Sequence, residues 1–173
     1  IVDTTDKWIT ERTGIKERRV SSDDETSVDM AYQASIDAIN KSGLKKDEIG
    51  AIFLATCTPE RKFPSTAVLL QNRLNIKNAF SVDLNAACTG FVYALDIAKK
   101  YIESQQVKYA LVVGTEKITS LLDWTDRNTC VLFGDGAGAM IVGSSDTAGI
   151  LSSTIGSDGS YKDLLTVNTD LEY

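Results

Sequence analysis

Short apolar runs alternate along this chain with segments whose apolar residues recur at helical spacing, and this alternation restricts the fold more than any other feature. Polar residues or glycine bound the runs, which is typical of buried strands. Strands that alternate with helices favour an α/β fold with a largely parallel sheet. We expect five strands, at Ala51–Ala55, Ala79–Leu84, Ala110–Gly114, Ala137–Val142 and Gly149–Ile155.

Capping residues indicate where the helices begin and end. Threonine or serine stands at the start of the first three, and glycine follows the first two, as is common at helix termini. We expect helices from Asp6 to about Arg12, from Thr26 or Ser27 to Gly43, from Ser65 to Leu74, and from Cys88 to about Ser104.

Composition and charge exclude several classes of protein. The chain has 173 residues, 43% of them hydrophobic, which suits one domain with a sizeable core. Its net charge of -6 argues against nucleic acid as a partner, and no apolar stretch is long enough to span a membrane. The 3 cysteines are widely spaced without a CxxC pair, which argues against a disulfide scaffold or a metal site. They indicate a reducing compartment, and we expect the cytoplasm.

Cys88 stands where the small residues Ala86–Ala87 meet the start of the fourth expected helix. Ligands of an open α/β sheet gather at the carboxyl ends of its strands, and the strand Ala79–Leu84 ends just before this cysteine. Backbone N–H groups at a helix N-terminus favour an anion, and therefore a reactive thiolate. The alternative is a small buried side chain, which is the commonest environment of a free cysteine. For Cys57 and Cys130, packing is the better interpretation.

The glycine-rich stretch Phe133–Ala139 invites comparison with a phosphate-binding loop. Such a loop needs a strand before the glycines and a helix after them, whereas Ala139–Val142 is strand-like. Glycines that allow a tight turn and close backbone packing explain the stretch better. We therefore exclude nucleotide binding by this loop.

One indole and two guanidinium groups form a third feature. Trp8 and Arg12 lie on one face of the first expected helix, and Arg127 lies in a polar loop. Such groups stack on flat rings, and arginine also binds phosphate. Taken singly, each is more often an ordinary surface or structural residue.

Taken together, several segments resemble the β-ketoacyl-acyl carrier protein synthase III family, the initiating condensing enzymes of type II fatty acid synthesis. The resemblance implies a thiolase-like fold of two similar halves, each with a five-stranded sheet. Residues 1–173 would form most of the N-terminal half, without its first strand, so that the sheet would lack a central strand, and the C-terminal half would be absent. The segments are Asp3–Ile9, Arg12–Arg18, Ala86–Phe91, Asp126–Thr129 and Leu132–Ala139.

The resemblance also implies the chemistry. The thiolate of Cys88 would attack the thioester of an acyl-CoA primer, and the acyl-enzyme would then condense with malonyl-acyl carrier protein, without a permanently bound cofactor or a metal. The family's catalytic histidine and asparagine belong to the second half, and this chain contains no histidine. We therefore expect residues 1–173 alone to be inactive.

Further site residues follow from the same resemblance. The adenine of CoA would lie between a tryptophan and an arginine. Phe63 would reach into the partner's active site, which implies a homodimer. The residues are Trp8 and Arg127 for the adenine, Arg12 for the phosphates of CoA, Thr4 for a hydrogen bond, and Phe63 and Phe133 for the acyl pocket.

Two alternatives stay open. A related synthase, of the polyketide-starting or hydroxymethylglutaryl-CoA type, would keep the thiolase fold and change the chemistry. A non-catalytic thiolase-like partner subunit would account for the missing histidine, although the intact segment around Cys88 argues against it.

Overall fold

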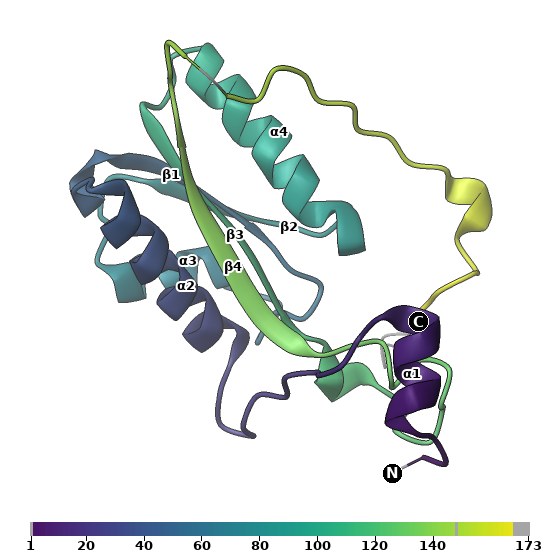
Figure 1. The fold of residues 1–173 in the computed structure, drawn as a ribbon. Helices are drawn as coiled ribbons and strands as arrows, with labels where there is room; N and C mark the ends of the chain where they lie inside the picture. Colours follow the sequence, from purple (N-terminus) through teal and green to yellow (C-terminus); the bar gives the residue numbers. More distant parts are fainter. Residues whose placement is uncertain (1, 148, 168–173) are drawn as a thin grey trace.

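The computed structural model describes residues 2–147 and 149–167, which form a four-stranded sheet with helices on both faces (Figure 1). The order across the sheet is β2-β1-β3-β4, in which β1 is parallel to both of its neighbours and β4 is antiparallel to β3. The expected α/β class with a mixed, mostly parallel sheet is confirmed. The strands are β1 (Ile49–Ala55), β2 (Phe80–Leu84), β3 (Tyr109–Lys117) and β4 (Asp135–Gly143).

The helices begin and end close to the capping residues of the sequence. The hydroxyl of Thr5 caps the first helix and that of Thr26 caps the second, while Gly14 and Gly43 end them in the left-handed conformation. The α-helices are α1 (Asp6–Thr13), α2 (Ser27–Ser42), α3 (Thr66–Leu74) and α4 (Gly90–Glu103), and the 3₁₀ turns are η1 (Lys46–Glu48), η2 (Ala87–Thr89), η3 (Ile118–Leu121) and η4 (Gly159–Tyr161).

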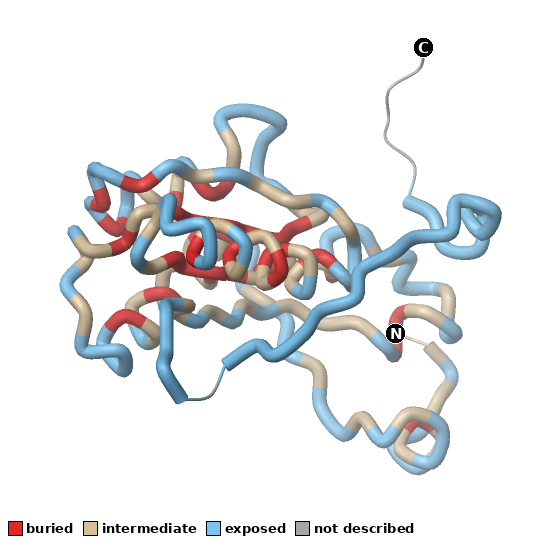
Figure 2. The backbone as a smooth tube through the Cα atoms, turned by 90° about the horizontal axis from the view of Figure 1, so that it is seen from above, coloured by how far each residue is buried: buried red, intermediate tan, exposed pale blue. Residues whose placement is uncertain are grey.

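Two apolar layers hold the sheet between its helices. β1 is buried on both faces, which explains its nearly continuous apolar sequence. Ile52 and Leu54 belong to the layer with α2 and α3, whereas Ala51 and Phe53 belong to the layer with α4. Figure 1 shows these helices on opposite sides of the sheet, and Figure 2 shows that burial concentrates there. Within the described residues, no helix is both long and apolar enough to cross a membrane.

The expected fifth strand at Gly149–Ile155 is wrong. The structure assigns no strand to the described part of this segment, which runs as extended chain beside α4 (Figure 1). The hydroxyl of Ser153 donates a hydrogen bond to Asp96, and that of Tyr93 donates to the carbonyl of Gly156. Because this segment lies over a helix instead of along β2 or β4, its backbone has no strand to pair with.

The expected gap at the centre of the sheet is also wrong. The four strands are hydrogen-bonded to their neighbours in one continuous order, so a further strand could be added only beyond β2 or β4. On β4, Gly136, Gly138 and Met140 alternate along the strand and are exposed, because α4 does not cover this part of the sheet. One face of β4 is therefore open.

Candidate active site

Cys88 is exposed and lies in η2, the turn between β2 and α4. The α-helix expected to start at this cysteine begins at Gly90 instead. Ala87 adopts a left-handed φ of 44°, and the N–H of Thr89 bonds back to the carbonyl of Ala86, so the chain turns once more before the helix. Left-handed backbone at a residue other than glycine costs free energy, and such strain is concentrated at active sites. The local backbone thus supports the prediction that Cys88 is a functional residue.

Two glycines let α4 pack closely against the carboxyl ends of β1 and β3. A Cβ atom on Gly90 would lie 3.1 Å from the Cβ of Ala55, the last residue of β1. A Cβ atom on Gly114, in β3, would lie 3.2 Å from the ring of Phe91 in the first turn of α4. These contacts place Cys88 at the carboxyl edge of the sheet, where ligands of such sheets bind.

The start of α4 carries partial positive charge beside this thiol. Among the described residues no side chain caps α4, and its first turn contains no acidic residue. The first N–H groups of a helix have no partner within the helix, and they carry partial positive charge. Here η2 already uses two of these groups, since the N–H of Thr89 bonds to the carbonyl of Ala86 and that of Gly90 to the carbonyl of Ala87. The positive end of α4 therefore favours a thiolate near Cys88 by its charge.

The other two cysteines have different environments. Burial raises the pKa of Cys57 to about 11, and the charge of Glu116 adds to the shift. Glu116 accepts a hydrogen bond from the backbone N–H of Cys57 at 2.9 Å and one from its thiol at 3.4 Å. Cys130 is buried in an apolar cluster with Ile9 and Val131. Cys88 is thus the cysteine best placed to react.

Trp8 carries two stacked guanidinium groups. The guanidinium carbon of Arg12 lies 4.4 Å from the centroid of the indole, and that of Arg127 lies 4.8 Å from it. Arg127 also donates a hydrogen bond to the carbonyl of Asp3 at 3.1 Å. A flat ring between Trp8 and Arg127 needs two contact distances of about 3.5 Å each. Arg127 must therefore move away by about 2 Å before a ring can enter.

A cavity of about 380 Å³ joins the start of the chain to the loop before β4. Thr4, Arg18 and Phe133 are among the residues that line it. The hydroxyl oxygen of Thr4 is buried and has no hydrogen-bond partner among the described residues. Such an oxygen costs free energy unless a bound molecule satisfies it, so the cavity suits a ligand with a polar group at that point.

The structure brings most of the sequence-predicted site residues into one region and leaves two apart. The residues predicted to bind CoA come from α1, the residues before it and the loop before β4. The same loop supplies one phenylalanine of the expected acyl pocket. Neither Cys88 nor Phe63 lines the cavity, and Phe63 is 83% exposed in the loop before α3. The residues brought together are Thr4, Trp8, Arg12, Arg127 and Phe133.

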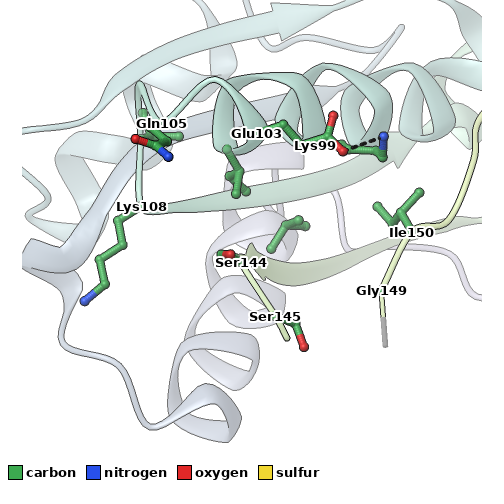
Figure 3. Close-up of a pocket in the computed structure, with 12 residues that line it drawn as sticks. Lys99, Glu103, Gln105, Lys108, Ser144, Ser145, Gly149 and Ile150 are labelled. Carbon is green, nitrogen blue, oxygen red and sulfur yellow. Dashed lines mark ion pairs between the residues drawn. The ribbon is translucent and has the colours of Figure 1, made fainter. Parts of the chain in front are cut away.

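A larger cavity of about 540 Å³ lies at the opposite end of α4 from Cys88 (Figure 3). Its lysines are already paired, since Lys99 lies 2.8 Å from Glu103 and Lys108 lies 3.9 Å from Glu48. None of the residues predicted to carry chemistry lines this cavity.

Sequence reasoning missed two carboxylates that organise the loops around the site. Glu116 binds the chain that follows β1, as described above. Asp135 accepts hydrogen bonds from both Ser21 and Thr119. Burial acts to raise the pKa of Asp135, but these hydrogen bonds outweigh it and lower the pKa. In the sequence, only its position inside the glycine-rich stretch indicated that Asp135 has a special role. Nothing in the neighbouring residues distinguishes Ser21, Thr119 or Glu116 from ordinary polar residues.

Comparison with known proteins supports the resemblance. The sequence model of the family 3-oxoacyl-[acyl-carrier-protein] synthase III matches residues 82–159. A β-ketoacyl-[acyl-carrier-protein] synthase III from Xanthomonas oryzae pv. oryzae is 53% identical over 165 residues, which cover 95% of this chain and 51% of the relative. The crystal structure of a synthase III from Thermus thermophilus superposes with a TM-score of 0.93 at 40% identity, over 99% of this chain and 53% of that one.

A third similar protein is a priming β-ketosynthase of the R1128 polyketide pathway. It superposes with a TM-score of 0.82 at 42% identity, over 86% of this chain and 44% of that one. The chain thus spans about half the length of the proteins it matches. The resemblance to β-ketoacyl-acyl carrier protein synthase III and the thiolase-like fold are confirmed.

Proposed function

We propose that residues 1–173 form most of the N-terminal half of a β-ketoacyl-acyl carrier protein synthase III. The whole protein would be an acyltransferase that condenses an acyl-CoA primer with malonyl-acyl carrier protein and so initiates fatty acid synthesis. One observation carries this proposal: an exposed Cys88 in a strained turn before α4, in a chain 53% identical to a synthase of that name. Three free cysteines support a cytoplasmic location.

The chemistry starts at Cys88. Its thiolate attacks the thioester carbonyl of acyl-CoA, and the N–H of Cys88 is a candidate donor to the oxyanion that forms. CoA leaves as its thiol, and the acyl group stays on the sulfur. Malonyl-acyl carrier protein then loses carbon dioxide, and the resulting carbanion attacks the acyl group and releases the thiolate of Cys88.

The second step needs groups beyond this chain. Negative charge develops on the thioester oxygen as malonyl loses carbon dioxide, and hydrogen-bond donors must stabilise it. The family uses a histidine and an asparagine of the second half, and residues 1–173 contain no histidine. The open face of β4 supports a covering second half, because its exposed residues alternate with partly buried residues, of which Ala139 and Ile141 pack against the core.

The cluster around Trp8 supports binding of the nucleotide end of CoA. Entry of the adenine would replace the direct stack of Arg127 on Trp8 with a stack of three layers, which retains the contacts of both side chains. Arg12 lies beside the same ring and can meet phosphate. The unpartnered hydroxyl of Thr4 would supply the further hydrogen bond.

Two phenylalanines would shape the acyl pocket. Phe133 lines the cavity that also contains Thr4, which supports its position on the path of the substrate. Phe63 is too exposed to serve a pocket within this chain, which favours contact with a second copy. The edge strand β2 also exposes Phe80 and Val82, as expected of a surface that a homodimer would cover.

A polyketide-starting synthase is the second candidate. The 42% identity with the R1128 priming β-ketosynthase favours it, because that protein superposes over 86% of this chain. The two candidates share Cys88 and the acyl-enzyme, and they differ in the carrier protein that they use. Condensation assays with fatty acid and polyketide carrier proteins would separate them.

Acylation of Cys88 tests the proposal. The complete protein that contains this chain is incubated with an acyl-CoA labelled in its acyl group, and the modified peptide is mapped. We expect the label on Cys88 and its absence from the Cys88→Ala variant, while Cys57→Ala and Cys130→Ala keep it. A label on Cys57 or Cys130 with Cys88 unmodified would contradict the proposal. Residues 1–173 alone should form no carbon–carbon bond.

A further inference from the structure

Apart from Cys88 and Phe63, the proposed site residues come from two stretches of chain. The N-terminal segment (residues 2–26) carries Thr4, Trp8 and Arg12, and the β3–β4 loop (residues 118–134) carries Arg127 and Phe133. Neither stretch contains a strand, so pairing in the sheet does not set their relative position. Side-chain contacts must hold the two stretches together if they are to form one site.

The carboxylate of Asp135 supplies such contacts. One of its oxygens accepts hydrogen bonds from the N–H of Ser21 at 2.9 Å and from the Ser21 hydroxyl at 2.7 Å. Thr119 donates its N–H at 2.9 Å and its hydroxyl at 2.7 Å to the same carboxylate. Ser21 belongs to the N-terminal segment, and Thr119 to the start of the β3–β4 loop. One carboxylate therefore closes the base of the loop and ties it to the N-terminal segment.

The backbone beside Asp135 reinforces this connection. The N–H of Asp135 donates to the carbonyl of Arg19 at 2.7 Å. A Cβ atom on Gly134 would lie only 2.9 Å from the same carbonyl oxygen, so the close approach requires glycine. Arg18 and Val20, on either side of Arg19, line the cavity that contains Thr4 and Phe133. Asp135 thus controls how closely the two walls of that cavity approach each other.

A lysine makes a second connection from the neighbouring strand. The ammonium group of Lys117, at the end of β3, donates to the carbonyls of Ser22 and Glu25 at 2.8 Å and 2.7 Å. Both carbonyls belong to the N-terminal segment, just after Ser21. The end of β3 and the start of β4 therefore hold the same stretch of chain from two sides.

We infer that Asp135 is the positioning residue of the CoA site, the group that fixes the N-terminal segment against the β3–β4 loop. This inference rests on the proposed function, because the two stretches matter to catalysis only if CoA binds between them. Asp135 acts through Ser21 and Thr119, and within the described residues none of its hydrogen bonds reaches the turn that carries Cys88. It should therefore govern the use of CoA and leave the reactivity of the thiol unchanged.

Acylation of Cys88 by two thioesters tests this role in the complete protein. Acyl-CoA reaches the CoA site, whereas the same acyl group on N-acetylcysteamine lacks the nucleotide. In Asp135→Asn the amide nitrogen cannot accept a hydrogen bond, so at least one of the four contacts is lost. We expect the half-saturating acyl-CoA concentration to rise on the order of tenfold while the maximal rate stays within about threefold. The rate with acyl-N-acetylcysteamine should change much less, since this thioester has no nucleotide to bind between the two stretches.

Two further variants separate positioning from general loss of stability. Asp29→Asn removes a carboxylate that binds Arg73 and Thr26, the last residue of the N-terminal segment, but has no hydrogen bond to the β3–β4 loop within the described residues. It should therefore leave the acyl-CoA concentration dependence unchanged. The double variant Ser21→Ala with Thr119→Ala removes the hydroxyl donors and should reproduce the effect of Asp135→Asn.

The outcomes distinguish this inference from the proposed function. An active wild type whose Asp135→Asn variant uses acyl-CoA normally would refute the inference alone. The inference would also be refuted if Asp135→Asn lowered the rate equally with both thioesters. It would be refuted as well if Asp29→Asn raised the half-saturating acyl-CoA concentration as much as Asp135→Asn does. If Asp135→Asn does not fold, the double variant Ser21→Ala with Thr119→Ala tests the inference by the same criteria. A wild type that acyl-CoA does not acylate at all would refute the proposed function and the inference together.

Discussion

Burial and the charge of Glu116 both act on the thiol of Cys57, and replacement of Glu116 tests how the chain distinguishes its cysteines. The pKa of Cys57 is raised from 9.0 to about 11, first by burial and then by the charge of Glu116. At pH 8 a thiol of pKa 11 is about 0.1% thiolate, whereas one of pKa 9 is about 10% thiolate. The folded structure thus lowers the reactive fraction by up to about a hundredfold.

Glu116→Gln removes the charge and leaves the burial. Because burial is the larger cause, only part of the hundredfold difference should be recovered, and we expect alkylation of Cys57 to become roughly tenfold faster at pH 8. The assay measures iodoacetamide labelling of Cys57 by mass spectrometry between about pH 7 and pH 10, in a Cys88→Ala background. The apparent pKa of labelling should fall in the variant.

Glu60→Gln is the matched control for this experiment. Glu60 lies in the loop that follows Cys57, and it accepts a hydrogen bond from the N–H of Val28 at 3.1 Å. It is not among the groups that shift the pKa of Cys57, so labelling should not change. An unchanged rate in Glu116→Gln would refute the electrostatic argument. A rate raised equally at every pH would refute it as well, since that indicates a loosened loop.

Trp8→Ala or Arg127→Ala should lower kcat/KM for acyl-CoA roughly tenfold, which corresponds to about 1–2 kcal/mol, and should not unfold the protein. Equal kinetics in wild type and variants would exclude the stacking site. The pKa of Asp29 is lowered to about 2, first by its hydrogen bond with Thr26 and then by Arg73. Its stabilising contribution is therefore complete above the unfolded-state pKa and is lost as the pH falls from about 4 to 2. Partial exposure of the pair limits this contribution to about 1 kcal/mol. The free energies of unfolding of wild type and Asp29→Asn, measured in urea, should therefore converge at low pH.

Much of the secondary structure was predictable because its signals are local. Thr5 and Gly14 bound α1 as the capping pattern predicted, and Thr26 and Gly43 bound α2. The apolar run around Phe53 became a fully buried strand, since a parallel sheet covers both faces of its central strands. Neighbouring residues alone carry these signals, so the sequence suffices to read them.

The segment Gly149–Ile155 shows where local signals fail. Its apolar residues match a strand, but a strand exists only when another strand lies beside it. The chain instead follows α4 and is held there by Ser153 and Asp96. Likewise α4 begins at Gly90 instead of Cys88, because residues 87–89 form the tighter 3₁₀ turn η2, which the spacing of apolar residues does not indicate.

The candidate site divides in the same way. The sequence by itself determined that Cys88 follows a strand and precedes a helix, because both elements are encoded next to it. Only the tertiary structure decided that Arg127 stacks on Trp8 and that Asp135 binds Ser21, which lies 114 residues away in the chain. Such contacts depend on how the loops fold back over the sheet. The free energy of a hydrogen bond or a stacked pair depends on the distance between its groups in space, which the spacing of residues along the chain does not contain.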